Sequence, residues 1–114
     1  MNVSPFFKLE IFAPAEAVDE ILEVLAATHA GEIGNYDHCT SITQVDGSYR
    51  PLEGATPAIG EIGKLFFGGE VKIEVNCREG YLMEAIQAVR DIHPYEEPVI
   101  NVIPLANARY GATM

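Results

Sequence analysis

The residues best suited to chemistry lie in one hexapeptide, His93-Pro94-Tyr95-Glu96-Glu97-Pro98, which holds an imidazole, a phenol and two carboxylates between prolines. Imidazole and carboxylate groups bind zinc and other divalent ions, and a histidine–cysteine pair elsewhere could complete the set. The candidate metal ligands are His38, His93, Glu96 and Glu97. The favoured interpretation is nevertheless a rigid corner, because proline forces the preceding residue into extended backbone. We therefore expect no cofactor, with a divalent metal ion or an organic ligand as alternatives.

A second candidate is the loop predicted over residues 51–64, which is rich in glycine and proline. Backbone N–H groups in a glycine-rich turn can bind phosphate, here with help from Arg50 or Lys64. The sequence lacks the Gly-x-x-x-x-Gly-Lys-Ser/Thr pattern of nucleotide-binding loops. A structural loop, or one ordered by a neighbouring subunit, is therefore favoured, and a small anionic ligand is the alternative.

The run Tyr36-Asp37-His38-Cys39 offers a nucleophile beside a base. A catalytic cysteine needs a histidine that faces it across a cleft, whereas the side chains of adjacent residues usually diverge. We therefore expect no enzyme, and an enzyme of unknown reaction ranks last among the functional alternatives.

The 114 residues include seven basic and seventeen acidic side chains, which give a net charge of −10. Such a surface repels phosphate backbones and anionic membranes, so we expect neither nucleic-acid nor membrane binding. No apolar run approaches the roughly 18 residues of a membrane span, and the first residues lack a signal-peptide pattern. The expectation is a single cytoplasmic domain over residues 1–114, in which Cys39 and Cys77 form no disulfide framework.

Hydrophobic periodicity predicts six elements. Alternating or β-branched runs indicate strands over residues 5–13, 40–45, 70–77 and 99–105. Helical spacing indicates one helix from Pro14 to a stop at Gly31 and another over residues 81–92, which must end near His93. Asp46-Gly47 is typical of a turn within the second strand, which Ser48-Tyr49-Arg50 would continue, and residues 106–114 are expected to form a short tail.

The predicted order β-α-β-β-α-β is the pattern of α+β, ferredoxin-like sandwiches, in which two helices cover one face of an antiparallel sheet. The first and third strands then lie side by side in the centre. Their faces away from the core carry Lys8, Glu10, Lys72 and Glu74. Opposite charges at cross-strand distance would favour this pairing by a few tenths of a kcal/mol.

Three motifs in order along the chain resemble one known family. They are Gly34-Asn35-Tyr36-Asp37-x-Cys39, Arg50-Pro51-Leu52-Glu53-Gly54-Ala55-x-Pro57-x-Ile59-Gly60-x-x-Gly63 and His93-Pro94-Tyr95-Glu96-Glu97-Pro98. Together they look like the YqfO-type, PII/CutA-like module, which occurs alone and as the middle domain of Nif-three-like (NGG-interacting-factor) dinuclear-metal proteins. The last motif also resembles the closing segment of CutA, a trimeric protein linked to divalent-cation tolerance.

The resemblance implies a PII/CutA-type fold and a homo-oligomer, with a trimer favoured. It does not imply the metal enzyme, because the larger relatives build their dinuclear site from His and Glu residues of flanking domains. No position in this sequence matches those ligands, so an activity such as GTP cyclohydrolase is not carried over. The expected function is a non-enzymatic, self-associating module, and the alternatives are a CutA-type divalent-metal-binding protein or an enzyme.

In that function the three motif loops would cluster at clefts between subunits and bind a small ligand or a protein partner. The candidate ligand-binding residues are Asn35, Tyr36, Arg50, Gly54, Gly60, Gly63, His93 and Tyr95.

Overall fold

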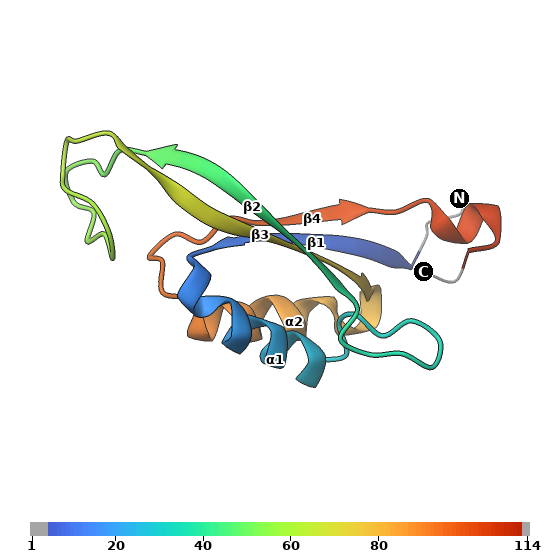
Figure 1. Ribbon diagram of the computed structural model, residues 1–114. Coiled ribbons are helices and arrows are strands. Elements are labelled where there is room, and N and C mark those ends of the chain that lie inside the picture. The colour runs from blue at the N-terminus through green and yellow to red at the C-terminus, as the bar shows by residue number, and fades with distance from the viewer. Residues whose placement is uncertain (1–4, 113–114) are drawn as a thin grey trace.

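The computed structural model describes residues 5–112, and its elements follow the predicted order (Figure 1). The strands are β1 (Phe6–Ala13), β2 (Thr40–Tyr49), β3 (Phe66–Arg78) and β4 (Ile100–Pro104). The helices are α1 (Val18–Ala27) and α2 (Glu79–Ile92), with 3-10 turns η1 (Ala15–Ala17) and η2 (Asn107–Tyr110). The turn η2 falls in the predicted tail, whose last two positions, 113–114, lie outside the described residues.

The strands form one antiparallel sheet in the order β2-β3-β1-β4, with β1 and β3 paired in the centre as predicted. Both helices cover the same face of this sheet (Figure 1). The fold is therefore the predicted ferredoxin-like sandwich.

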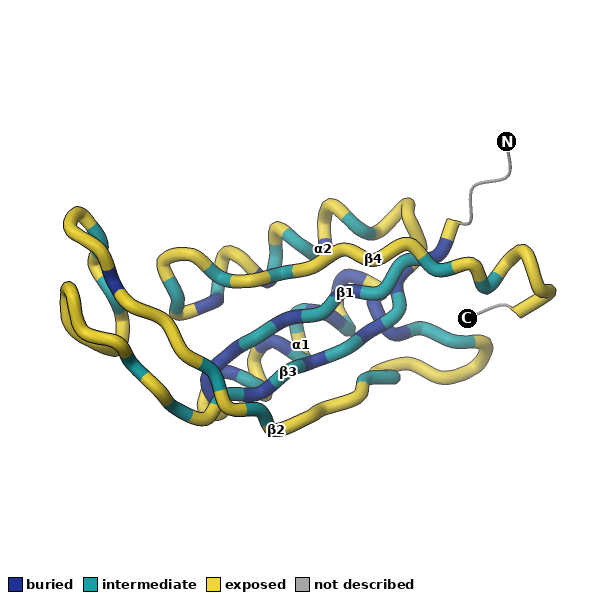
Figure 2. Tube along the Cα trace, turned by 90° about the horizontal axis from the view of Figure 1, so that it is seen from above, coloured by how far each residue is buried: buried dark blue, intermediate teal, exposed yellow. Residues whose placement is uncertain are grey.

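The core lies between the helices and the two central strands, where the tube is coloured as buried in Figure 2. Alternate residues of β1 and β3 point inward, and apolar residues at helical spacing meet them. The largest fully buried side chains are Leu9, Ile11, Ile21, Leu25, Ile73, Val75, Val89 and Cys77. Burying each large apolar side chain stabilises the fold by about 1.5–3 kcal/mol.

The opposite face of the sheet carries the charges that the alternation predicted. Lys8 lies opposite Asn76, so its Nζ reaches Glu74 on the diagonal, at 3.1 Å. The Lys72 ammonium lies 3.8 Å from the same carboxylate. These cations, with Lys8 as the main cause, hold the pKa of Glu74 below its ordinary value. Both lysines of this face therefore pair with Glu74, whereas Glu10 accepts a hydrogen bond from the Asn101 amide at 2.9 Å.

The β2–β3 hairpin extends beyond the other two strands and makes the molecule elongated (Figure 1). Strand β1 pairs with β3 only from Val71 to Arg78, so the outer half of the hairpin lacks a third strand. The radius of gyration is 15.6 Å, whereas a compact domain of this length has about 13 Å. The prediction of a turn at Asp46-Gly47 is wrong, because Gly47 pairs with Gly68 inside a continuous ladder.

The helix ends follow proline as expected, with one correction. His93 has extended backbone (φ −69°, ψ 132°) and terminates α2, as the following proline predicted. Pro14 is not the first helical residue, because its own backbone is extended (φ −68°, ψ 153°) and helical geometry begins at η1. Among residues 5–112, no helix is both long and apolar enough to cross a membrane.

Candidate ligand-binding groove

A groove of about 630 Å³ lies between the hairpin loop, residues 50–65, and the corner, residues 93–99. We call it the hairpin groove. Two of the three sequence motifs therefore meet within one chain. The loop and the hairpin end contribute Ser48, Tyr49, Arg50, Pro51, Leu52, Ala55, Pro57, Ala58 and Ile59 to the lining. The sheet and the corner contribute Phe12, Glu70, Tyr95, Glu96, Glu97 and Val99.

Glu96 fastens the loop to the corner. Its Oε1 accepts a hydrogen bond from the Thr56 backbone N–H at 3.1 Å, and its Oε2 accepts one from the Thr56 hydroxyl at 2.8 Å. The hydroxyl bond, followed by the N–H bond, lowers the pKa of Glu96 from its ordinary value. A carboxylate of the chain itself therefore occupies donors that the glycine-rich loop was predicted to offer an external anion.

His93 is buried behind the groove and joins the corner to β1. Its Nε2–H donates to the Phe12 carbonyl at 2.8 Å, and its Nδ1 accepts the Tyr95 backbone N–H at 3.1 Å. Both contacts are satisfied together only by the neutral imidazole with its proton on Nε2. Burial lowers the pKa of His93, against the opposing effects of the Phe12 carbonyl and Glu70. Neither ring nitrogen is left free for a metal ion.

Tyr95 lies in the groove, as its candidate role requires, and its hydroxyl donates to Glu70 Oε2 at 3.4 Å. Burial, followed by the charge of Glu70, raises the pKa of Tyr95 to about 12. The phenol therefore stays protonated. The other Glu70 oxygen, Oε1, lies over Gly47, where a Cβ would approach it to 2.7 Å. Glycine at that position makes room for the carboxylate.

The hairpin loop is held in shape by Tyr49 and by glycine. The Tyr49 hydroxyl donates to the Ile59 carbonyl, and its ring packs against Phe66 with centroids 5.1 Å apart. Gly54, Gly60 and Gly63 all have left-handed backbone, with φ of 98°, 105° and 77°. At Gly60 this conformation brings the chain against the Tyr49 ring. These glycines shape the loop, and none of the three lines the groove.

The charges in the groove are mainly negative. Glu70, Glu96 and Glu97 line it, and Arg50 is its one cation. Lys64, the other predicted helper for an anion, instead pairs with Glu61 at 2.6 Å. This balance does not favour an anionic ligand.

The first motif lies at the other end of the molecule, in the loop between α1 and β2 (Figure 1). There Ile33 and Tyr36 close a short turn through paired backbone hydrogen bonds, and the Tyr36 side chain is 75% exposed. Asn35 sits within that turn. These two candidate residues do not join Arg50 and Tyr95 within one chain.

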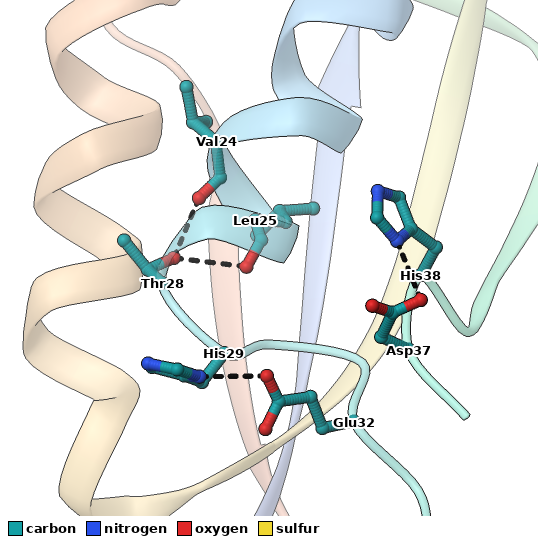
Figure 3. Close-up of polar contacts among 7 residues, drawn as sticks. All are labelled: Val24, Leu25, Thr28, His29, Glu32, Asp37 and His38. Carbon is teal, nitrogen blue, oxygen red and sulfur yellow. Dashed lines mark hydrogen bonds and ion pairs between the residues drawn. The ribbon is translucent and has the colours of Figure 1, made fainter. Parts of the chain in front are cut away.

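His38 and Cys39 belong to the same distant loop, and Figure 3 shows His38 beside Asp37. His38 Nδ1 contacts Asp37 Oδ1 at 2.9 Å, and this contact raises the pKa of His38. Cys39 Sγ approaches the Asp37 carbonyl at 3.6 Å rather than the imidazole. His38 and Cys39 are thus not arranged as a nucleophile and its base.

The predicted metal ligands are also not assembled. His38 lies in the α1–β2 loop, His93 is occupied on both nitrogens, and Glu96 is bonded to Thr56. Across residues 5–112, no group of three or more His, Cys, Asp or Glu side chains is placed to hold a metal ion.

Sequence reasoning missed Phe12, Glu70 and Thr56 as groove residues or loop anchors. Phe12 had a usable signal, because it is an apolar residue on the strand face that otherwise carries Lys8 and Glu10. Glu70 and Thr56 had none. Their roles arise from contacts across 25 and 40 residues of chain.

No family model matches the chain. Two curated relatives, both called GTP cyclohydrolase 1 type 2 homologues, match 89% of it. The protein of Halalkalibacterium halodurans is 42% identical and that of Bacillus subtilis 36%, each over 101 residues. The chain spans about a quarter of these relatives, 27% of the length of each.

Solved structures agree with the sequence match. A Bacillus cereus protein related to NIF3 covers 94% of the chain at 33% identity with a TM-score of 0.80, and 27% of that protein is matched. The divalent cation tolerance protein CutA of Archaeoglobus fulgidus covers 88% at 22% identity with a TM-score of 0.65, and 83% of it is matched. The predicted resemblance is confirmed: the chain is homologous to one segment of the NIF3-type (YqfO-type) proteins, and its fold is that of CutA.

Proposed function

We propose that this chain is a non-enzymatic, self-associating module that binds a small ligand or a protein partner in the hairpin groove. The GTP cyclohydrolase name belongs to proteins of which the chain matches about a quarter. Among residues 5–112, the predicted nucleophile and base, Cys39 and His38, both contact Asp37 rather than one another. A trimer is the favoured assembly, as the resemblance to CutA implies.

The projecting hairpin is the observation that carries self-association. Its outer half has no third strand, and its loop and strands leave large apolar side chains exposed. Phe67 is 72% exposed and Leu65 60%. Contiguous exposed apolar side chains usually mark an interaction surface. A second copy that covers them would remove the area from water at about 25 cal/mol per Å².

Light scattering coupled to gel filtration tests this proposal. The purified chain should elute at a multiple of its 12.4 kDa mass, and Phe67→Ser should lower that mass or make it concentration-dependent. Met83→Ser is the matched control, because Met83 is 84% exposed on α2, away from the hairpin. A monomeric wild type at micromolar concentration would refute self-association.

The divalent-metal alternative has less support in the arrangement of side chains. It needs His93, whose two nitrogens already bond Phe12 and Tyr95. Calorimetry with Zn²⁺ on the wild type and on His93→Ala, with circular dichroism to verify that the variant is folded, tests it directly. Saturable binding that this substitution removes would favour the metal alternative.

A further inference from the structure

The chemistry of the hairpin groove narrows its ligand class, on the basis of the ligand function proposed above. Its volume of about 630 Å³ falls in the range of sites that hold drug-sized molecules. Prolines and aliphatic side chains such as Pro51, Leu52 and Pro57, together with aromatic side chains, make up most of its lining. A ligand that fits must therefore have an apolar body.

The polar groups that face this body are hydrogen-bond acceptors. Glu70 is half-buried, and its Oε2 accepts a hydrogen bond from the Tyr95 hydroxyl, whereas its Oε1 has no hydrogen-bond partner among residues 5–112. Glu97 also lines the groove and forms no ion pair in that part of the chain. Carboxylates of this kind need N–H donors or positive charge from the ligand.

The donors that an anion would require are already in use. Both Thr56 donors bind Glu96, and the Gly63 N–H donates to the Pro51 carbonyl at 2.7 Å. The Tyr95 hydroxyl donates to Glu70. Among the residues that line the groove, the exposed Arg50 is the one basic side chain, against three carboxylates. An anion would face net repulsion there.

Aromatic rings stand beside the free acceptor. Phe12, Tyr49 and Tyr95 line the same groove as Glu70. Ring faces attract organic cations, and a carboxylate beside them adds a charged hydrogen-bond acceptor for an ammonium group. We propose that the hairpin groove binds an organic cation, an amine carried on an apolar ring or chain, with Glu70 as its counter-ion.

Three probes of similar shape and different charge test the proposal. We would titrate 2-phenylethylamine, 2-phenylethanol and phenylacetate into the ¹⁵N-labelled chain and follow the backbone amides of residues 95–97. Isothermal calorimetry would give the affinities for the wild type, Glu70→Gln and Glu84→Gln. The control residue Glu84 is exposed on α2, outside the groove. The amide oxygen of glutamine at position 70 can still accept the hydrogen bond from the Tyr95 hydroxyl, and circular dichroism verifies that the variant is folded.

The expected result is that the amine binds and shifts these amides. Glu70→Gln should weaken it at least tenfold, and Glu84→Gln should leave it unchanged. Equal binding of 2-phenylethanol, or stronger binding of phenylacetate, would overturn the cation assignment while leaving the groove as a ligand site. If no probe at millimolar concentration shifts residues 95–97, the ligand groove itself is refuted.

Discussion

Replacing His93 tests how the corner is held, because this buried side chain makes two partly buried hydrogen bonds at once. In His93→Leu, the Phe12 carbonyl and the Tyr95 N–H both lose their partner. A net hydrogen bond contributes about 1 kcal/mol, and a buried group left unsatisfied costs about 1–3 kcal/mol. We expect a loss of about 2–4 kcal/mol in the free energy of unfolding.

His93→Gln is the matched variant. The glutamine Nε2 can take the position of the imidazole Nε2 and donate to Phe12, but glutamine has no acceptor in place of Nδ1. About half of the lost stability should therefore return. Urea denaturation followed by circular dichroism at pH 7.5, at one fixed protomer concentration, measures both variants. A loss below about 0.5 kcal/mol in His93→Leu, or equal losses in the two variants, would refute this account of the corner.

The pH dependence follows from the same geometry. The folded protein holds the neutral imidazole, so the pKa of His93 is lower in the folded than in the unfolded state. Between these two pKa values the unfolded state binds more protons. The contribution of His93 to the free energy of unfolding is therefore complete above about pH 6.5, and it falls as the pH drops toward the pKa of His93 in the folded state. His93→Leu should lack this part of the pH profile.

Two further predictions concern the loop anchor and the thiols. Thr56→Val removes the hydroxyl hydrogen bond to Glu96, so it should raise the pKa of that carboxylate in ¹³C NMR titrations and speed proteolysis of the hairpin loop. Thr43→Val on β2 is the control. Equal effects of the two substitutions would contradict the role of Thr56 as the loop anchor. Dithionitrobenzoate should modify Cys39 but not Cys77 in the native protein, because Cys77 is fully buried and burial raises its pKa to about 11. Modification of both thiols without denaturant would show that the core around Cys77 opens.

The fold was predictable because it rests on local patterns. Alternation in β1 and β3 and helical spacing in α2 each depend on residues close in sequence, and proline set the end of α2 at His93. The length of the hairpin was not predictable in the same way. Asp46-Gly47 has a turn composition, and only the opposite pair Gly68-Gly69 shows that the ladder continues through it.

The groove was predictable only in part. Arg50 and Tyr95 belong to motifs and do line it, whereas Phe12 and Glu70 come from strands whose pairing brings them there. The composition of the corner suggested ligands, but its His93 and Glu96 serve the chain itself. A sequence shows that an imidazole and a carboxylate are present but not what they bind. Here the His93 imidazole binds the Phe12 carbonyl, and the Glu96 carboxylate binds Thr56.

The separation of the motifs also constrains any assembly. The α1–β2 loop with Tyr36 and the hairpin groove lie at opposite ends of a molecule 48 Å long (Figure 1). They can form one cleft only if the loop of one copy reaches the groove of another. Such a contact joins two different surfaces, and repeated head to tail it gives a ring, such as a trimer, where the rotation between copies closes. In a two-fold dimer, the loop of each copy could reach the groove of the other only if the two molecules lay antiparallel along their full length. The mass measured by light scattering therefore distinguishes a shared cleft in a ring from an antiparallel pair.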